Sequence, residues 1–251
     1  MENIDYDLRS VQEARDLARK GQIATEKLAT YTEDQIDRII RNMVRVSEEN
    51  AVTLAQMAVE ETGFGKVADK TYKNHMASTL LYDAIKDMKT IGVIHEDPAL
   101  GTMDVADPVG LLMGIVPSTN PTSTAIFKSI IAVKARNAIV FSPHPSAVKC
   151  TARAAELMHC KEVKMIIATG GPGMVKAAYS AGKPALGVGA GNSPAYIERT
   201  ANIKQAVTNI IASKTFDYGT ICASEQSIIC EECNKDAVIA ELKAQGAYFM
   251  S

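Results

Sequence analysis

Apolar residues in the first part of the chain recur at helical spacing. Residues 7–30 form a mostly polar run with scattered apolar positions, which predicts a solvent-exposed helix. Thr32 and Gln35 have the spacing of a capping box, in which two side chains satisfy free backbone amides at a helix start. The apolar positions that follow lie on one helix face: Ile36, Ile39, Ile40 and Met43.

Glycines mark the end of this second predicted helix. It is expected to run to about Thr62, where Gly63 and Gly65 stop it. Residues 67–88 predict another helix. We interpret His75 within it as a helix-face residue with a local partner, and assign it no function.

From residue 103 onward, short apolar runs alternate with helical segments. Residues 103–123 predict two short strands, and the second, Val109–Val116, is as apolar as a strand buried on both faces. Further strands are expected within AIVFSPHPSA (138–147), KMIIATGGPGMVKAAYSAGK (164–183), PALGVGAGNSPAYI (184–197) and SEQSIICEE (224–232). Helices are expected within residues 125–137, 164–183, 201–216 and 234–246. This alternation predicts βαβ units, and hence an α/β fold with a mostly parallel sheet.

Composition narrows the class of protein. The chain has 251 residues, of which 47% are hydrophobic and none is tryptophan, so it can bury a sizeable core in one large or two small domains. The net charge is −2 with acids and bases interspersed, which argues against a nucleic-acid partner. No apolar run reaches membrane-spanning length and the N-terminus is polar, so we expect a soluble, cytoplasmic protein without a membrane partner.

The five cysteines do not predict a disulfide framework, because their number is odd and no export signal precedes them. Cys230 and Cys233 form a CxxC motif, but no second pair stands at zinc-site spacing. We therefore predict no metal, and interpret this motif as a strand end that runs into a loop.

Four predicted strands end in loops rich in small and polar residues. These loops are IVPSTNP (115–121), FSPHP (141–145), IATGGPG (167–173) and GVGAGNSP (187–194). Parallel sheets bind ligands at the carboxyl ends of their strands, and glycine allows a backbone to approach a phosphate closely. The pattern suggests a dinucleotide site, but neither glycine-rich loop is a strict GxGxxG, so ordinary strand-to-helix turns stay an alternative.

Cys222 lies among small and polar residues in FDYGTICASEQS (216–227). Small neighbours give access to its sulfur, as a nucleophile requires, and the apolar strand that follows would fix its backbone. A buried structural cysteine is the alternative, because no histidine lies nearby in the sequence.

Five ordered stretches resemble the aldehyde dehydrogenase superfamily, and within it the CoA-acylating branch. They are KNHMAS (73–78), IVPSTNPTSTAIFKS (115–129), ARNAIVFSPHP (135–145), IATGGPGMVKAAYSAGKPALGVGAGNSPA (167–195) and SKTFDYGTICASEQS (213–227). The branch includes stand-alone acetaldehyde or propionaldehyde dehydrogenases and the N-terminal half of bifunctional aldehyde–alcohol dehydrogenases. The resemblance implies a Rossmann-like NAD-binding domain over residues 1–214 and the start of a second α/β catalytic domain over residues 215–251.

The resemblance also implies roles for individual residues. Cys222 would attack the aldehyde carbonyl, and Asn120, with the backbone amide of the cysteine, would stabilise the oxyanion. An ungapped match to hydrolytic relatives places Thr119 at the position of Asn120 instead. The cofactor-binding positions that it implies are Pro117, Ser118, Thr119, Ser142, His144, Thr169, Gly170, Gly171 and Gly189. Among these, Ser142 and His144 stand where hydrolytic relatives bind the adenosine ribose through lysine, and residues 169–171 match the pyrophosphate turn.

One departure from hydrolytic relatives indicates the acyl acceptor. Those relatives use a glutamate to activate water, and Val188 or Gly189 occupies its place here. Without a general base, attack by water is slow. The enzyme thioester would therefore pass to CoA, and the reaction would convert a short-chain aldehyde, CoA and NAD reversibly into acyl-CoA and NADH.

Two further departures concern the extent of the chain. Relatives have about twice this length, the usual size of a two-domain α/β enzyme. Near Ala155 and Glu156 a segment of about 20–30 residues, the size of part of a βαβ crossover, is expected to be missing. We therefore expect this polypeptide to be poorly active alone, and its full-length form to be a homo-oligomer, which could be cytoplasmic, fermentative or enclosed in a bacterial microcompartment. The alternatives are a γ-glutamyl phosphate reductase-like enzyme and a non-catalytic nucleotide-binding fragment.

Overall fold

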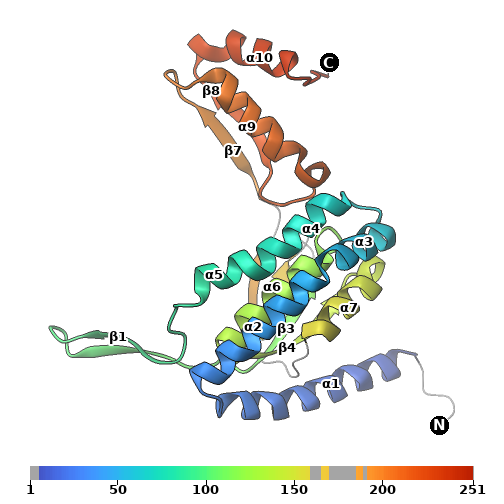
Figure 1. Ribbon diagram of the computed structural model, residues 1–251, viewed down its shortest axis with the longest axis vertical. Helices are drawn as coiled ribbons and strands as arrows, with labels where there is room; N and C mark the ends of the chain where they lie inside the picture. Colours follow the sequence, from blue (N-terminus) through green and yellow to red (C-terminus); the bar gives the residue numbers. More distant parts are fainter. Residues whose placement is uncertain (1–5, 159–164, 170–184, 189–190, 251) are drawn as a thin grey trace.

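The computed structural model describes residues 6–158, 165–169, 185–188 and 191–250. Most of these residues form a helical body around a parallel sheet, and an arm with the last two strands and helices rises from it (Figure 1). The predicted α/β class is confirmed. In the described part of the chain, no helix is long and apolar enough to cross a membrane.

The N-terminal helices begin and end largely where the sequence predicts. Their bounds are α1 (Tyr6–Ala29), α2 (Glu33–Glu49) and α3 (Ala51–Thr62). The capping box is complete: the Gln35 amide donates to Thr32 Oγ1 at 3.3 Å, and the Thr32 amide donates to Gln35 Oε1 at 2.8 Å. Gly63 ends α3 with φ 70°. The expectation of one continuous helix up to Thr62 is wrong, because Asn50 leaves helical geometry with φ −110° and ψ 6° and separates α2 from α3.

The helix expected over residues 67–88 contains a wider turn. It consists of α4 (Val67–His75), a π-helical segment (Met76–Leu80) and α5 (Leu81–Ile85). The carboxylate of Glu48 on α2 accepts hydrogen bonds there from Ser78 at 2.7 Å and Thr79 at 2.6 Å, and lies 2.9 Å from His75 Nδ1. His75 is thus a helix-face residue with a local partner, as predicted.

A four-stranded parallel sheet forms the centre of the body, in the order β4-β3-β5-β6. Its strands are β3 (Leu111–Val116), β4 (Ala138–Pro143), β5 (Met165–Thr169) and β6 (Ala185–Val188). Helix α6 (Pro121–Lys134) connects β3 to β4. It packs with α2, α3 and α7 (Val148–Met158), and the contacts of these helices with one another and with the sheet bury the main core. The apolar strand predicted at Val109–Val116 is β3, and the sheet is Rossmann-like.

Two smaller sheets extend from this body. Strands β1 (Gly92–Asp97) and β2 (Thr102–Ala106) form an antiparallel hairpin that projects outward (Figure 1). The sequence pattern did not predict β1. In the arm, β7 (Ser193–Ile197) pairs in parallel with β8 (Glu225–Cys230), beside α9 (Ile203–Thr215) and α10 (Lys235–Ala244).

The arm has its own small core, in which Ile197, Val207 and Val238 are buried. The predicted division at residues 214 and 215 would assign β7 and α9 to one domain and β8 and α10 to the other, although these four elements pack together. That division stays a prediction. Helix α7 runs across the predicted seam at residues 155 and 156 and ends at Met158.

Removal of the α2 cap tests this local assignment. We expect Thr32→Ala to lower the free energy of unfolding by about 1 kcal/mol, because the Gln35 amide loses its acceptor. Urea denaturation followed by circular dichroism measures the change. The control is Thr53→Ala at an exposed position of α3, which should cost nothing because alanine has the higher helix propensity. Equal losses in both variants would contradict a capping role.

Candidate active site

The carboxyl edge of the parallel sheet brings several predicted cofactor positions together. Ile115 on β3 is in register with Ser142 on β4 and with Ala168 on β5. The amide of His144 donates to Val116 O at 2.9 Å, so the chain after β4 lies beside the end of β3. The loop over residues 117–120 and the segment 142–144 therefore share this edge, as expected for ligand loops of a parallel sheet.

The individual cofactor candidates differ in how far they are described. Pro117, Ser118 and Thr119 are partly buried, as are Ser142 and His144. His144 Nδ1 lies 2.8 Å from Ser146 Oγ. Thr169 is the last residue of β5. The three glycines predicted to bind cofactor, Gly170, Gly171 and Gly189, lie outside the described residues.

Cys222 lies in an exposed turn between α9 and β8. The chain enters this turn through three consecutive residues with positive φ: Asp217 (48°), Tyr218 (56°) and Gly219 (70°). Two of them are not glycine, so the left-handed backbone costs free energy that neighbouring contacts must offset. The exposed position excludes the alternative of a buried structural cysteine, and leaves the sulfur open to a reagent or substrate.

Close packing surrounds the backbone of this turn. A Cβ atom on Gly191 would lie 3.0 Å from the carbonyl oxygen of Cys222, so the chain before β7 passes tightly against the cysteine. Ser224 is fully buried, and its hydroxyl has no hydrogen-bond partner among the residues that the structure describes. The exposed sulfur therefore belongs to a segment whose backbone is confined on at least two sides.

Asn120 stands at the start of α6 but does not cap it with its side chain. Its Oδ1 accepts a hydrogen bond from Lys73 Nζ at 2.7 Å, and its Nδ2 donates to Thr119 Oγ1 at 3.1 Å. The side chain is thus oriented by helix α4, which carries Lys73, and by its neighbour in the loop. Pro121 is the first residue of α6, where its missing amide costs nothing.

The carboxylate of Asp217 connects the Cys222 turn to this loop. Asp217 is 0% exposed and accepts hydrogen bonds from Lys73 Nζ and from Lys70 Nζ, the latter at 3.2 Å. It also accepts from the Lys66 amide at 2.7 Å and from Thr220 Oγ1 at 2.7 Å. These contacts fix the segment that precedes Cys222 against helix α4.

Burial and charge determine the ionisation of this network. Lys70 is 2% exposed and Lys73 is 5% exposed. Burial raises the pKa of the Asp217 carboxyl, but hydrogen bonds from Lys73, Thr220 and the Lys66 amide more than offset this, so the pKa lies below its ordinary value. Burial lowers the pKa of Lys73, and the contact with Asp217 acts in the opposite direction. Asp217 is therefore the counter-ion that allows two lysines to be buried together.

Lys70 extends the network to the backbone of the loop. Its Nζ donates to Thr119 O at 2.8 Å in addition to Asp217. Through Lys70 and Lys73, one carboxylate thus reaches both the main chain and the side chains of residues 119 and 120. The structure joins Asn120 and the Cys222 turn in a single hydrogen-bonded network.

Sequence reasoning missed the charged members of this network, Lys70, Lys73 and Asp217. One signal was available in the sequence. Lys70 and Lys73 are three residues apart on one helix, so they share a face. If that face packs against the body, the two buried charges need a counter-ion. It also missed Lys128 on α6, which is 2% exposed and donates to Ile115 O at 2.7 Å. Burial lowers the pKa of Lys128 to about 8.

In the described part of the chain, no three His, Cys, Asp or Glu side chains cluster as potential metal ligands. Cys230 is the last residue of β8, and Cys233 is exposed in the short helical turn that follows. Both are free thiols. The CxxC motif is thus a strand end that runs into a loop.

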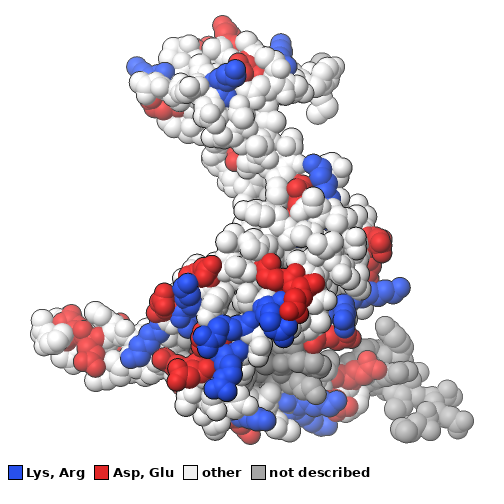
Figure 2. Space-filling model, viewed as in Figure 1, with Lys and Arg blue, Asp and Glu red and all other residues white. Residues whose placement is uncertain are grey.

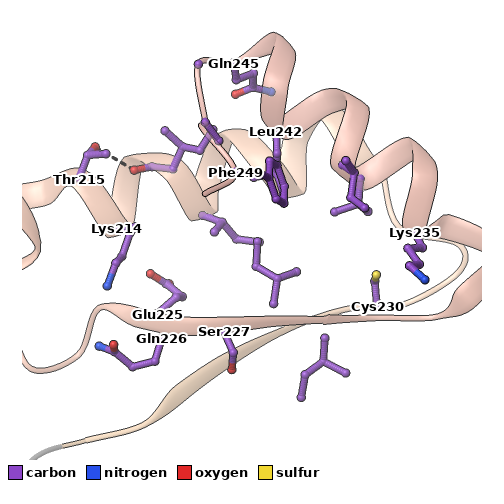
Figure 3. Close-up of a pocket in the computed structure, with 18 residues that line it drawn as sticks. Lys214, Thr215, Glu225, Gln226, Ser227, Cys230, Lys235, Leu242, Gln245 and Phe249 are labelled. Carbon is purple, nitrogen blue, oxygen red and sulfur yellow. Dashed lines mark hydrogen bonds between the residues drawn. The ribbon is translucent and has the colours of Figure 1, made fainter. Parts of the chain in front are cut away.

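The pocket shown in Figure 3 lies elsewhere. It has a volume of about 900 Å³ between β8, α9 and α10, and its lining includes Ile211, Leu242 and Phe249 but neither Cys222 nor Asn120. Lys214 and Glu225 lie at one end of the pocket and Lys235 lies at the other, so its charged side chains do not converge on one point (Figure 3). This apolar groove lacks the convergent polar groups of a catalytic site.

Comparison with known proteins identifies the family. The sequence profile of the aldehyde dehydrogenase family matches residues 4–160 and 152–248. This chain belongs to the aldehyde dehydrogenase family. An acetylating aldehyde dehydrogenase from Geobacillus thermoglucosidasius superposes with a TM-score of 0.93 at 51% identity, over 99% of this chain and 62% of that one.

Two other members of the aldehyde dehydrogenase family give further context. The bifunctional aldehyde-alcohol dehydrogenase AdhE of Escherichia coli is 46% identical over 270 residues, which cover 96% of this chain and 30% of that protein. A propionaldehyde dehydrogenase from Rhodopseudomonas palustris with bound propionyl-CoA superposes with a TM-score of 0.81 at 30% identity, over 94% of this chain and 59% of that one. The chain therefore spans less than a third of the E. coli protein and about three fifths of the two solved relatives.

Removal of the Asp217 charge tests the network in this aldehyde dehydrogenase chain. We expect Asp217→Asn to lower the free energy of unfolding by about 3–5 kcal/mol, because two buried lysines lose their counter-ion. Urea denaturation at pH 7 measures the loss. The control is Asp104→Asn, at an exposed position of β2, which should change stability little. A similar small change at both positions would exclude Asp217 as the centre of the network.

The stabilisation that Asp217 contributes should also depend on pH. The folded-state pKa of Asp217 is depressed, so its stabilisation is present above the unfolded-state pKa and is lost as the pH falls through the folded-state value. The difference in unfolding free energy between wild type and Asp217→Asn should therefore narrow as the pH falls below about 4. Urea midpoints measured from pH 7 to pH 2.5 test this. A difference that stays constant would show that the charge of Asp217 is not what stabilises the fold.

Proposed function

We propose that this chain is the nucleophile-bearing part of a CoA-acylating aldehyde dehydrogenase. The enzyme would convert a short-chain aldehyde, CoA and NAD reversibly into acyl-CoA and NADH. The observation that carries the proposal is the network in which Asp217 and Lys73 connect the turn of the exposed Cys222 to the Asn120 side chain. The names of the relatives support the reaction class, since one is acetylating and another holds propionyl-CoA.

Cys222 and Asn120 have separate roles in this reaction. The Cys222 sulfur, as thiolate, forms a bond to the aldehyde carbon, and the carbonyl oxygen takes up the negative charge. A free N–H of Asn120 Nδ2 and the backbone amide of Cys222 would donate to that oxygen. Collapse of the adduct expels hydride from the same carbon and leaves a thioester on Cys222. The CoA thiolate then attacks the thioester carbon, and the Cys222 sulfur leaves as thiolate.

NAD would supply the hydride acceptor when bound at the carboxyl edge of the sheet. The described residues fit such a ligand, because residues 117–119 and 142–144 place hydroxyl groups and an imidazole side by side at the ends of β3 and β4. Ser142 and His144 would hold the adenosine half. We propose NAD rather than NADP on the resemblance alone.

The choice of CoA over water follows from the chemistry at the end of β6. Val188 is the last residue of that strand, and either it or Gly189 stands where hydrolytic relatives have a general base. Neither side chain can accept a proton, so deacylation by water would be slow. A thioester that persists can be captured by a stronger nucleophile such as the CoA thiolate.

Further features of the whole enzyme are proposals from the same resemblance. We place an NAD-binding domain before residue 215 and a catalytic domain after it, with a homo-oligomeric, cytoplasmic or microcompartment-enclosed parent. We also propose that a segment is missing near residues 155 and 156. The alignment with the E. coli relative supports a missing segment, although not its place, because it has 270 positions and this chain has 251 residues. The relative therefore contains residues that this chain lacks.

Acyl exchange with propionyl-CoA tests the nucleophile. We expect incubation with propionyl-CoA to place a propionyl thioester on Cys222 and to release CoA, because the deacylation step is reversible and needs no NAD. Mass spectrometry of peptides locates the acyl group. Cys222→Ala should lose the modification, whereas Cys233→Ala, which removes another exposed cysteine, should keep it. Acylation spread evenly over the exposed cysteines would contradict a specific nucleophile.

The complete reaction is tested by NADH absorbance with propionaldehyde and NAD. We expect any NADH formation by this chain to depend on CoA and to disappear in Cys222→Ala, because a covalent mechanism has no other route. Turnover that is equally fast without CoA would contradict the CoA-acylating assignment. Phosphate-dependent acyl formation without CoA would favour the γ-glutamyl phosphate reductase type.

A further inference from the structure

We propose that Lys73 is a positioning residue of this reaction: with Asp217 as its counter-ion, it orients the Asn120 amide so that an N–H of Nδ2 faces the substrate oxygen. The inference rests on the proposed function and adds to it a residue that does not itself touch the reacting atoms. It comes from the contacts of three side chains on three different segments of the chain.

The chemistry of the ammonium group fixes the orientation of the amide. Lysine has three donors and no acceptor, so the atom of Asn120 that faces Lys73 Nζ at 2.7 Å must be the carbonyl oxygen. Nδ2 then points away from Lys73. An Asn120 side chain that rotated by half a turn would bring its N–H₂ group against a buried cation, which is electrostatically unfavourable.

The outward-facing Nδ2 has capacity for a second acceptor. It carries two N–H groups, and among the described residues it donates to one acceptor, Thr119 Oγ1 at 3.1 Å. The second N–H is thereby available for an oxygen that becomes negative during attack. A preoriented donor of this kind needs no reorganisation in the transition state, and this is why it accelerates the reaction.

Asp217 in turn holds Lys73 in place and connects it to the nucleophile. Its carboxylate receives the Lys73 ammonium and the hydroxyl of Thr220, two residues before Cys222. The same buried group therefore sets the position of the oxyanion donor and that of the sulfur. An ordinary structural ion pair would not need to contact the side chain of Asn120.

Lys70 provides a matched comparison within the same network. It lies one helical turn before Lys73 on α4, is equally buried, and binds the same carboxylate. Its other hydrogen bond goes to the backbone oxygen of Thr119 and not to the Asn120 side chain. Loss of Lys70 removes a buried charge of the same kind but leaves the partner of the amide in place.

The first measurement is protection of Cys222 from iodoacetamide by propionaldehyde, followed by mass spectrometry. We expect Lys73→Met to weaken protection about tenfold or more, because the oxyanion donor loses its orientation. Lys73→Arg should recover most of the protection, since a guanidinium also donates several N–H groups. Lys70→Met should show a clearly smaller loss. Cys150, which is buried, reports unfolding in each variant through its own alkylation.

Two results would overturn the proposal. One is an equal loss of Cys222 protection in Lys73→Met and Lys70→Met without increased alkylation of Cys150. The other is full protection of Cys222 in Lys73→Met. A wild-type chain that propionaldehyde does not protect would instead contradict the proposed function, and a second measurement then decides the role of Lys73. The Nδ2 proton of Asn120 that bonds Thr119 Oγ1, assigned by its absence in Asn120→Ala, should exchange more slowly in wild type and Lys70→Met than in Lys73→Met. Equal exchange rates in all three proteins would exclude the positioning role.

Discussion

The carboxylate of Asp217 is the contact on which the arrangement of this site depends. Without it, two buried lysine ammonium groups would lose the carboxylate that both of them contact, and the left-handed backbone of the Cys222 turn would lose the hydrogen bonds that hold it. The stabilisation is mutual, because the lysines also stabilise the charged form of the Asp217 carboxylate, which is fully removed from solvent. The lysines and the carboxylate each lower the free-energy cost of burying the other, so loss of one charged group destabilises the rest.

This unit works because of the elements that present its members. Helix α4 offers lysines on one face, the parallel sheet delivers the loop with Asn120 at its carboxyl edge, and the arm returns the cysteine turn to the same place. The main body thus positions the loop that carries Asn120, and the arm positions the turn that carries Cys222. Acidic and basic side chains are interspersed over the face shown in Figure 2, so that face carries no surface field of one sign.

Most elements could be predicted from the sequence, because periodicity and capping are local properties. The capping box at Thr32 and the apolar strand ending at Val116 are examples in which neighbouring residues contain the whole signal. The break at Asn50 was missed because asparagine in a helical pattern is only mildly unfavourable and tertiary contacts decide its geometry. The small neighbours of Cys222 favoured an accessible sulfur, and the structure places this cysteine in an exposed turn, while its role as the nucleophile stays a prediction. The contact of Cys222 with Lys73 through Asp217 could not be predicted, since 144 residues separate the two charges and no local pattern records the pairing.

Gly65 shows how closely the backbone before helix α4 packs against the Asp217 carboxylate. Gly65 has φ 76°, and a Cβ atom there would lie 2.0 Å from Asp217 Oδ1. A side chain at position 65 and the carboxylate of Asp217 thus compete for one volume, so any residue other than glycine at position 65 would displace the group that the two buried lysines contact.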